Sequence, residues 1–211
     1  MNLSLRCDGL SLKKGYNLLA AGLDIVLSPG QALSLSGDNG AGKTTLLRAI
    51  AGFAPPAAGK IAFFDGETAL ESEAVQASMI HLLGHHDALS PSRTVAQELR
   101  FQADFLGGAV AAAAPLNLDG LMDLETRYLS AGQKRRLSCA RLLMARRPLW
   151  LLDEPMAPLD ASHRALLAGL MQDHLKAGGL IVAAVHDPLP FDTRTLRLQR
   201  PTPAQMEAVD G

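Results

Sequence analysis

Residues 37–44 read GDNGAGKT and match the pattern G-x-x-x-x-G-K-[S/T], which constrains this chain more than any other segment. The apolar run 31–36 precedes the pattern, and a helical pattern with Leu46, Leu47 and Ile50 on one face follows it. The glycines let backbone N–H groups point inward and the helix start adds partial positive charge, so the segment suits a phosphate group. The alternative, a glycine-rich turn before an ordinary helix, is disfavoured by the strand–loop–helix context. The predicted nucleotide-binding residues are Gly37, Asp38, Asn39, Gly40, Ala41, Gly42, Lys43, Thr44 and Thr45.

Two adjacent carboxylates, Asp153 and Glu154, end a second apolar run, LWLL. In proteins with a phosphate loop, an aspartate at such a place holds Mg²⁺, and Thr44 is expected to be its second protein ligand. Glu154 could then deprotonate the attacking water. Successive side chains of a strand point to opposite faces. Asp153 and Glu154 can therefore fill these two roles at one site only if the chain turns here, and Pro155 favours a turn. The alternative is a strand that ends at a solvated acidic turn.

The apolar runs predict an α/β fold with a mainly parallel sheet. They lie at 31–36, 79–83, 149–152 and 180–185, and each is apolar throughout or nearly so, as in strands that are buried on both faces. Each run ends in glycine or polar residues. Because ligands of such sheets bind at the carboxyl ends of the strands, we expect these ends to converge on one site.

Two other regions have different patterns. Residues 1–30 form short segments broken by glycines and, with residues 59–66, are expected to make a small antiparallel sheet. Residues from about 86 to 128 are predicted to be helical, with Thr94 as the N-cap of a helix that runs through Phe105.

Composition narrows the class of protein. The chain has 211 residues, which suits one domain, and its 20 basic and 21 acidic residues leave a net charge of -1. A balanced charge offers no global attraction to nucleic acid. The two cysteines, Cys7 and Cys139, form no disulfide framework, so a reducing cytosol is the expected compartment. No signal peptide or transmembrane helix is visible in the sequence.

The segment LSAGQ, residues 129–133, opens a predicted helix that runs through Arg146. Ser130 and Gln133 have the spacing of a capping box, so an ordinary helix start is the alternative to a functional motif. The arginines in this helix and directly after it are expected to lie on a solvated or partner-facing surface that does not bind nucleic acid. They are Arg135, Arg136, Arg141, Arg146 and Arg147.

Five segments, in this order, resemble the motifs of the ATP-binding cassette (ABC) family: GDNGAGKTT (37–45), LSAGQKRR (129–136), LWLLDEP (149–155), APLD (157–160) and VHD (185–187). The resemblance covers nearly the whole chain and implies a P-loop ABC ATPase that uses ATP and Mg²⁺. It implies one nucleotide-binding domain over residues 1–211. Within it, the core with the β subdomain would lie at about 1–85 and 146–205, and a small helical subdomain with the signature motif at about 86–145.

The resemblance also assigns roles to single residues. It implies a head-to-tail homodimer on ATP binding, in which the signature of one subunit completes the ATP site of the other. Asp160 would communicate across that interface, Glu154 would be the general base, and His186 would contact the γ-phosphate. The signature residues are Ser130, Ala131, Gly132 and Gln133.

Three positions depart from the family pattern. Ala131 stands where glycine is usual. Lys14 stands where an aromatic residue normally stacks on adenine, so Tyr16 is the expected adenine contact. His85 replaces the glutamine that usually links Mg²⁺ to the membrane partner, and the resemblance assigns it to the coupling loop. Metal or haem ligation by His85 and His86 is the alternative, and the absence of a C-x-x-C-H motif weighs against it.

Residues 82–101, 146–160 and 178–189 resemble the ATP-binding subunit of the haem exporters used in cytochrome c biogenesis. This finer resemblance implies integral membrane permease subunits as partners, no nucleic acid, and a peripheral location on the cytoplasmic face of the inner membrane. Three alternatives remain: an ABC ATPase subunit for a different cargo, a soluble ABC protein that clamps nucleic acid or ribosomes, and a P-loop kinase of a small molecule.

Overall fold

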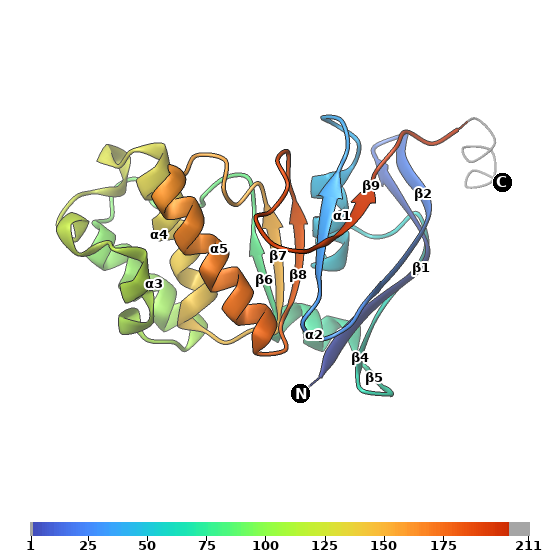
Figure 1. Cartoon of the computed structure of the whole chain (residues 1–211), viewed down its shortest axis with the longest axis horizontal. Coiled ribbons are helices and arrows are strands. Elements are labelled where there is room, and N and C mark those ends of the chain that lie inside the picture. Colours follow the sequence, from blue (N-terminus) through green and yellow to red (C-terminus); the bar gives the residue numbers. More distant parts are fainter. Residues whose placement is uncertain (1, 203–211) are drawn as a thin grey trace.

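The computed structural model describes residues 2–202, so residues 203–205 of the predicted core lie outside the described part of the chain. It contains two sheets, a parallel sheet in the centre of the molecule and an antiparallel sheet along one side (Figure 1). Helices α3, α4 and α5 lie on the opposite side from the antiparallel sheet (Figure 1). The predicted α/β class with a mainly parallel core and an antiparallel β sheet is confirmed.

The parallel sheet has the strand order β6-β7-β8-β3-β9, and every neighbouring pair is parallel. Its strands are β3 (Ala32–Ser36), β6 (Ile80–Leu83), β7 (Leu149–Asp153), β8 (Leu180–Ala184) and β9 (Arg194–Arg197). All residues of β7 and β8 are buried, as their apolar runs predict. The edge strand β9 was not predicted, because its sequence RTLR is polar and mostly exposed.

The antiparallel sheet has the order β2-β1-β4-β5. Its strands are β1 (Leu3–Lys14), β2 (Asn17–Leu27), β4 (Ala58–Asp65) and β5 (Thr68–Leu70). The expectation of short segments in the first 30 residues was wrong, since β1 and β2 are long strands. Gly9 and Gly22 do not end them; each has a positive φ, of 58° and 64°, and lies where the register shifts. Such bulges bend a strand without ending it.

The helices cover the two faces of the parallel sheet. Side chains alternate along β7, so Leu149 and Leu151 face one core, while Trp150 and Leu152 face the other. The first core also holds α1 (Lys43–Ile50), α2 (Ser72–Ser78) and the antiparallel sheet. The second core holds α3 (Val95–Leu106), α4 (Ala131–Met144) and α5 (Ala161–Lys176). Helices α1 and α4 therefore lie on opposite faces of the sheet.

The region predicted to be helical between 86 and 128 is only partly so. Helix α3 is capped by Thr94, as expected, in a full capping box with Gln97. Three short 3₁₀ segments follow: η1 (Val110–Leu116), η2 (Asp119–Leu121) and η3 (Thr126–Tyr128). Helix α4 ends at Met144, two residues before the predicted end, and Ala145 is already extended, with φ -127° and ψ 128°. Within residues 2–202, no helix combines the length and apolar character that a membrane crossing requires.

Candidate active site

The predicted phosphate loop joins β3 to α1 and depends on its glycines. Gly37, Gly40 and Gly42 have φ values of 130°, 82° and 102°, which L side chains rarely adopt. A Cβ at Gly37 would lie 2.5 Å from the carbonyl oxygen of Leu198, so the backbone also approaches its neighbour closely. The Lys43 side chain is buried, and Nζ donates to the carbonyl oxygens of Gly37 at 2.5 Å and Asp38 at 3.3 Å. The ammonium group is thus held within the loop.

The two expected Mg²⁺ ligands lie together. Thr44, in the first turn of α1, donates from Oγ1 to Oδ2 of Asp153, the last residue of β7, at 2.8 Å. Asp153 is buried and Thr44 is exposed, so the pair sits at the surface of the core. Mg²⁺ in nucleotide sites takes one or two protein oxygens and completes its shell with water and phosphate. This donor set fits that chemistry.

The backbone turns at Glu154, as the two different roles expected of the Asp153 and Glu154 carboxylates require. Its φ of 50° is in the left-handed region, and its N–H still donates to the carbonyl oxygen of Ala184 in β8 at 2.9 Å. A left-handed residue directly after a strand breaks the alternation of side chains. The carboxylates of Asp153 and Glu154 can therefore have different partners. This agrees with the turn that was expected at Pro155.

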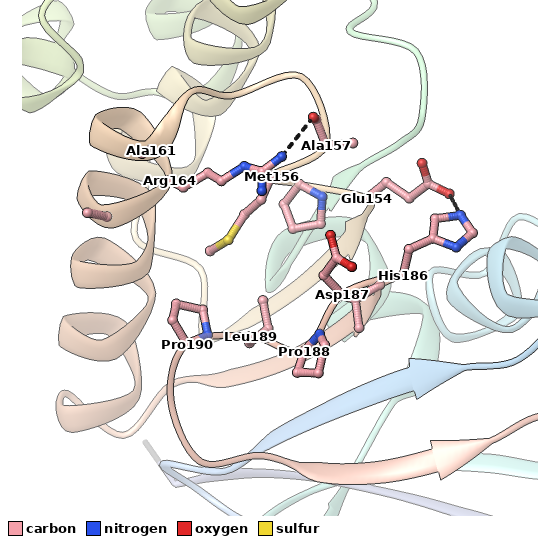
Figure 2. Close-up of a pocket in the computed structure, with 13 residues that line it drawn as sticks. Glu154, Met156, Ala157, Ala161, Arg164, His186, Asp187, Pro188, Leu189 and Pro190 are labelled. Atoms are coloured by element: carbon pink, nitrogen blue, oxygen red, sulfur yellow. Dashed lines mark hydrogen bonds and ion pairs between the residues drawn. The ribbon is translucent and has the colours of Figure 1, made fainter.

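The Glu154 carboxylate lies between two histidines. Oε1 is 2.9 Å from Nε2 of His186, and Oε2 is 3.8 Å from Nδ1 of His85. Figure 2 shows the side chains of Glu154 and His186 turned toward each other. Because these residues follow β7, β8 and β6, the structure brings the ends of three predicted strands to one site. His85 and His86 meet edge to face, and among residues 2–202 no group of three His, Cys, Asp or Glu could hold a metal ion.

A pocket of about 400 Å³ opens beside Glu154 and His186 (Figure 2). Its walls come from the loop after β7, the first turns of α5 and the segment after β8, and they are largely apolar. Arg164 on its wall donates to the carbonyl oxygens of Leu159 and Ala157, which fixes the loop that precedes α5. The pocket therefore adjoins the carboxylate and lies apart from the phosphate loop residues.

The signature residues lie at the start of α4. Ser130 accepts a hydrogen bond from the Gln133 N–H at 3.2 Å, and the Gln133 side chain accepts one from the Ser130 N–H at 2.8 Å. Ser130 and Ala131 are exposed, and a Cβ at Gly132 would lie 3.0 Å from the carbonyl oxygen of Pro158. Because α4 and α1 lie on opposite faces of the sheet, one chain does not bring this motif to its own phosphate loop.

Asp160 and Tyr16 are both placed at the surface. Asp160 caps α5: its carboxylate accepts from the His163 N–H at 2.9 Å and the Ser162 hydroxyl at 2.7 Å. The pKa of Asp160 is well below its usual value, chiefly because of the hydrogen bond from that N–H and then those from the two side chains. Tyr16 lies in the turn between β1 and β2 with a fully exposed side chain.

The prediction that the arginines between residues 135 and 147 lie on a solvated or partner-facing surface was wrong for Arg135. Its side chain is 2% exposed and donates to five oxygen atoms of the segments after β6 and β7. Arg147 likewise donates to the Ile80 carbonyl oxygen at 2.7 Å. The sequence does carry a signal for Arg135, because it shares a helical stripe, i, i+3 and i+7, with the buried residues Ser138 and Leu142.

Comparison with known proteins agrees with this geometry. Residues 20–157 match the family described as ABC transporter. The cytochrome c biogenesis ATP-binding export protein CcmA of Rhodopseudomonas palustris (strain HaA2) is 50% identical over 194 residues, which cover 90% of this chain and 95% of that protein. The protein of the same name from Bradyrhizobium diazoefficiens is 48% identical over 189 residues, covering 88% of this chain and 92% of that protein.

Solved structures share the fold. A putative ABC transporter ATP-binding protein from Pyrococcus furiosus superposes with a TM-score of 0.78 at 22% identity, covering 92% of this chain and 97% of that chain. A bacterial ABC transporter cassette solved as a dimer superposes with a TM-score of 0.77 at 20% identity, covering 92% of this chain and 94% of that chain. With the sequence matches, these results show that the chain belongs to the ABC transporter family and, within it, groups with the cytochrome c biogenesis ATP-binding export proteins.

Proposed function

We propose that this chain is the ATP-binding and ATP-hydrolysing subunit of an ABC exporter used in c-type cytochrome biogenesis, with haem as the cargo. One observation carries the hydrolytic part: the Glu154 carboxylate, 2.9 Å from His186 Nε2, directly follows the Asp153 that bonds Thr44. The names of relatives that are 48% and 50% identical support the exporter part.

In this proposal, residues 37–45 wrap the phosphates of ATP with backbone N–H groups, and Lys43 adds a positive charge. Thr44 and Asp153 would hold Mg²⁺, which would neutralise negative charge on the phosphate groups when bound. Glu154 accepts a proton from the attacking water, and His186 orients that carboxylate and contacts the γ-phosphate. Tyr16, exposed at the turn after β1, is the proposed adenine contact.

The site is proposed to be complete only in a head-to-tail dimer. The exposed start of α4 lies on the opposite face of the sheet from α1, so the α4 start of a second copy would supply Ser130 and Gly132. A capped helix start binds anions through its free N–H groups. A solved cassette of this fold is a dimer, which supports dimerisation. Asp160, at the start of α5, would then lie at the interface.

We further propose that residues of about 86–145 form the helical subdomain and that residues 1–85 and 146–205 form the core. Helix α4 contacts η1 and α3 more extensively than it contacts strand β6 of the core, which supports this division. Integral membrane permease subunits would dock on the helical subdomain and on the loop around His85. The chain would then act as a peripheral protein on the cytoplasmic face of the inner membrane, driving its partners by cycles of closure and release.

The test uses Glu154→Gln, which keeps the shape of the side chain and removes the base. Tagged complexes purified from membranes with ATP and Mg²⁺ should trap the closed dimer on its partners, with cytochrome c biogenesis proteins and haem recovered together. Glu73→Gln, an exposed glutamate on α2, is the matched control and should neither trap partners nor slow ATP hydrolysis.

The alternatives give different results. A different permease without haem would leave the ATPase assignment intact and contradict the cargo. Recovery of no membrane protein would contradict the transporter subunit and favour the soluble clamp. Full ATP hydrolysis by Glu154→Gln would contradict the proposed general base.

A further inference from the structure

Arg135 uses its whole guanidinium group inside the protein. Nε donates to the Pro155 carbonyl oxygen at 3.2 Å, and Nη2 donates to the carbonyl oxygens of Asp153 at 2.5 Å and Glu154 at 2.9 Å. Nη1 donates to the Gly84 carbonyl oxygen at 2.8 Å and to Oδ1 of Asp87 at 3.2 Å. A guanidinium has five N–H donors in a rigid plane, and here they face five acceptors.

The acceptors belong to the two segments that carry the reactive side chains. Three consecutive carbonyl groups, of residues 153–155, converge on one guanidinium, which an extended strand does not allow. They converge because the chain turns at Glu154, whose φ is 50°. For a residue other than glycine, the left-handed region is unfavourable and persists only where its surroundings stabilise it. Arg135 supplies that stabilisation at the backbone atoms of Glu154 and its neighbours.

Helix α4 also binds the segment that carries His85. Ser138 Oγ and Arg141 Nη2 both donate to the Asp87 carbonyl oxygen at 3.0 Å. With the Arg135 contacts to Gly84 and Asp87, one face of α4 therefore holds residues 84–87. The same helix is capped by Ser130, five residues before Arg135, where the signature lies.

We propose that Arg135 is a positioning residue that couples the signature helix and the His85 segment to the orientation of the Glu154 carboxylate. The inference rests on the proposed function, because it assigns to Arg135 a part in ATP hydrolysis. Arg135 touches neither the phosphate loop nor Thr44 in its hydrogen bonds, so it acts on the catalytic step and leaves ATP binding alone. Through these contacts of Arg135, a shift of helix α4 would directly change the backbone turn at Glu154.

The test compares Arg135→Gln and Arg135→Lys with Arg194→Gln in the complex purified from membranes. Arg194, in β9, is the matched control, since it also donates to a backbone carbonyl oxygen, that of Val26 at 2.7 Å, and belongs to none of the five motifs. Both Arg135 variants should lower kcat about 100-fold, with the KM for ATP changed less than about 3-fold. Lysine should preserve folding better than glutamine and still fail to restore kcat, because a single ammonium group cannot serve five acceptors.

A second experiment distinguishes the proposed positioning role from a purely structural one by combining each Arg135 variant with Glu154→Gln. If Arg135 acts through Glu154, Arg135→Lys should slow the residual hydrolysis of Glu154→Gln by less than about 3-fold, because the two losses are not additive. Additive losses, a proportional rise in KM, or a kcat equal to that of Arg194→Gln would overturn the inference while the proposed function stands. No ATP hydrolysis by the wild-type complex would overturn the proposed function and this inference with it.

Discussion

The Thr44 hydroxyl donates a 2.8 Å hydrogen bond to Oδ2 of Asp153, across 109 positions of the chain. This bond joins the first turn of α1 to the end of β7, so the phosphate loop and the acidic strand end form one unit. The hydroxyl and the carboxylate offer the oxygen atoms that Mg²⁺ prefers. The pair therefore locates the metal-dependent part of the proposed site.

The first prediction concerns this pair. Thr44→Val removes the hydroxyl and keeps the shape, so the Mg²⁺ concentration for half-maximal ATP hydrolysis should rise about 10- to 100-fold. Thr44→Ser, which retains the hydroxyl, is the control and should keep the wild-type value. The measurement is a Mg²⁺ titration of the ATPase rate at fixed ATP. An unchanged midpoint in Thr44→Val would remove Thr44 from the metal site.

The second prediction ranks the two histidines beside Glu154. His186 lies 2.9 Å from Oε1, within hydrogen-bonding distance, whereas His85 lies 3.8 Å from Oε2 and its side chain is 64% exposed. A long contact to an exposed side chain contributes little. His186→Ala should therefore lower kcat by about 100-fold or more, and His85→Ala by less than about 10-fold.

Steady-state ATP hydrolysis by the purified complex measures both variants, with ATP binding measured alongside. Because His85 belongs to the proposed coupling loop, His85→Ala should reduce the response of the ATPase to its membrane partners more than the basal rate. Equal losses of basal rate in the two variants would contradict the ranking.

The third prediction separates helix capping from phosphate binding. Ser130 and Thr94 form the same capping box, with Gln133 and Gln97, at the starts of α4 and α3. Replacing either by alanine should lower the free energy of unfolding by about 1 kcal/mol. Only Ser130→Ala should also lower ATP hydrolysis, because only Ser130 is proposed to contact the γ-phosphate of a second copy. Chemical denaturation and ATPase assays on both variants test this; equal ATPase rates would leave Ser130 as a cap alone.

Local patterns explain what could be predicted from sequence. The N-cap at Thr94 and the capping box at Ser130 depend on residues that are close in the chain, and both were predicted at the right place. The four apolar runs became β3, β6, β7 and β8, because a strand buried on both faces has few alternatives. The ends of three of these runs meet at Glu154, as the convergence of parallel strands requires.

Long-range contacts explain what was missed. The burial of Arg135 depends on carbonyl groups 18 to 51 positions away, and a charged residue in a helix otherwise suggests solvent. The edge strand β9 is held by its pairing with β3, and its polar sequence carries no strand signal. Gly9 and Gly22 lie at bulges within the long strands β1 and β2. These strands do not end there, because the partner strands continue past the glycines.

The last prediction concerns stability in acid. His81, in β6, is 3% exposed and its Nε2 lies 2.8 Å from the Ala145 carbonyl oxygen. Burial lowers the pKa of His81 to about 4, against the raising effect of that carbonyl, and the charges of Arg147 and Arg141 lower it further. Burial also lowers the pKa of His174, which stacks on Trp150. Both histidines are therefore expected to be neutral in the folded protein at pH 7.

The unfolded chain binds protons at these histidines near pH 6.5, whereas folded His81 does so only near pH 4, so stability should fall as the pH drops between these values. For His81 alone, the loss of free energy of unfolding at pH 5 should be about 2 kcal/mol. Denaturation at pH 7.5 and pH 5 should show a smaller difference for His81→Gln than for the wild type. His86→Gln, an exposed control, should match the wild type. If His81→Gln lost as much stability as the wild type between these pH values, His81 would not be the group that titrates on unfolding.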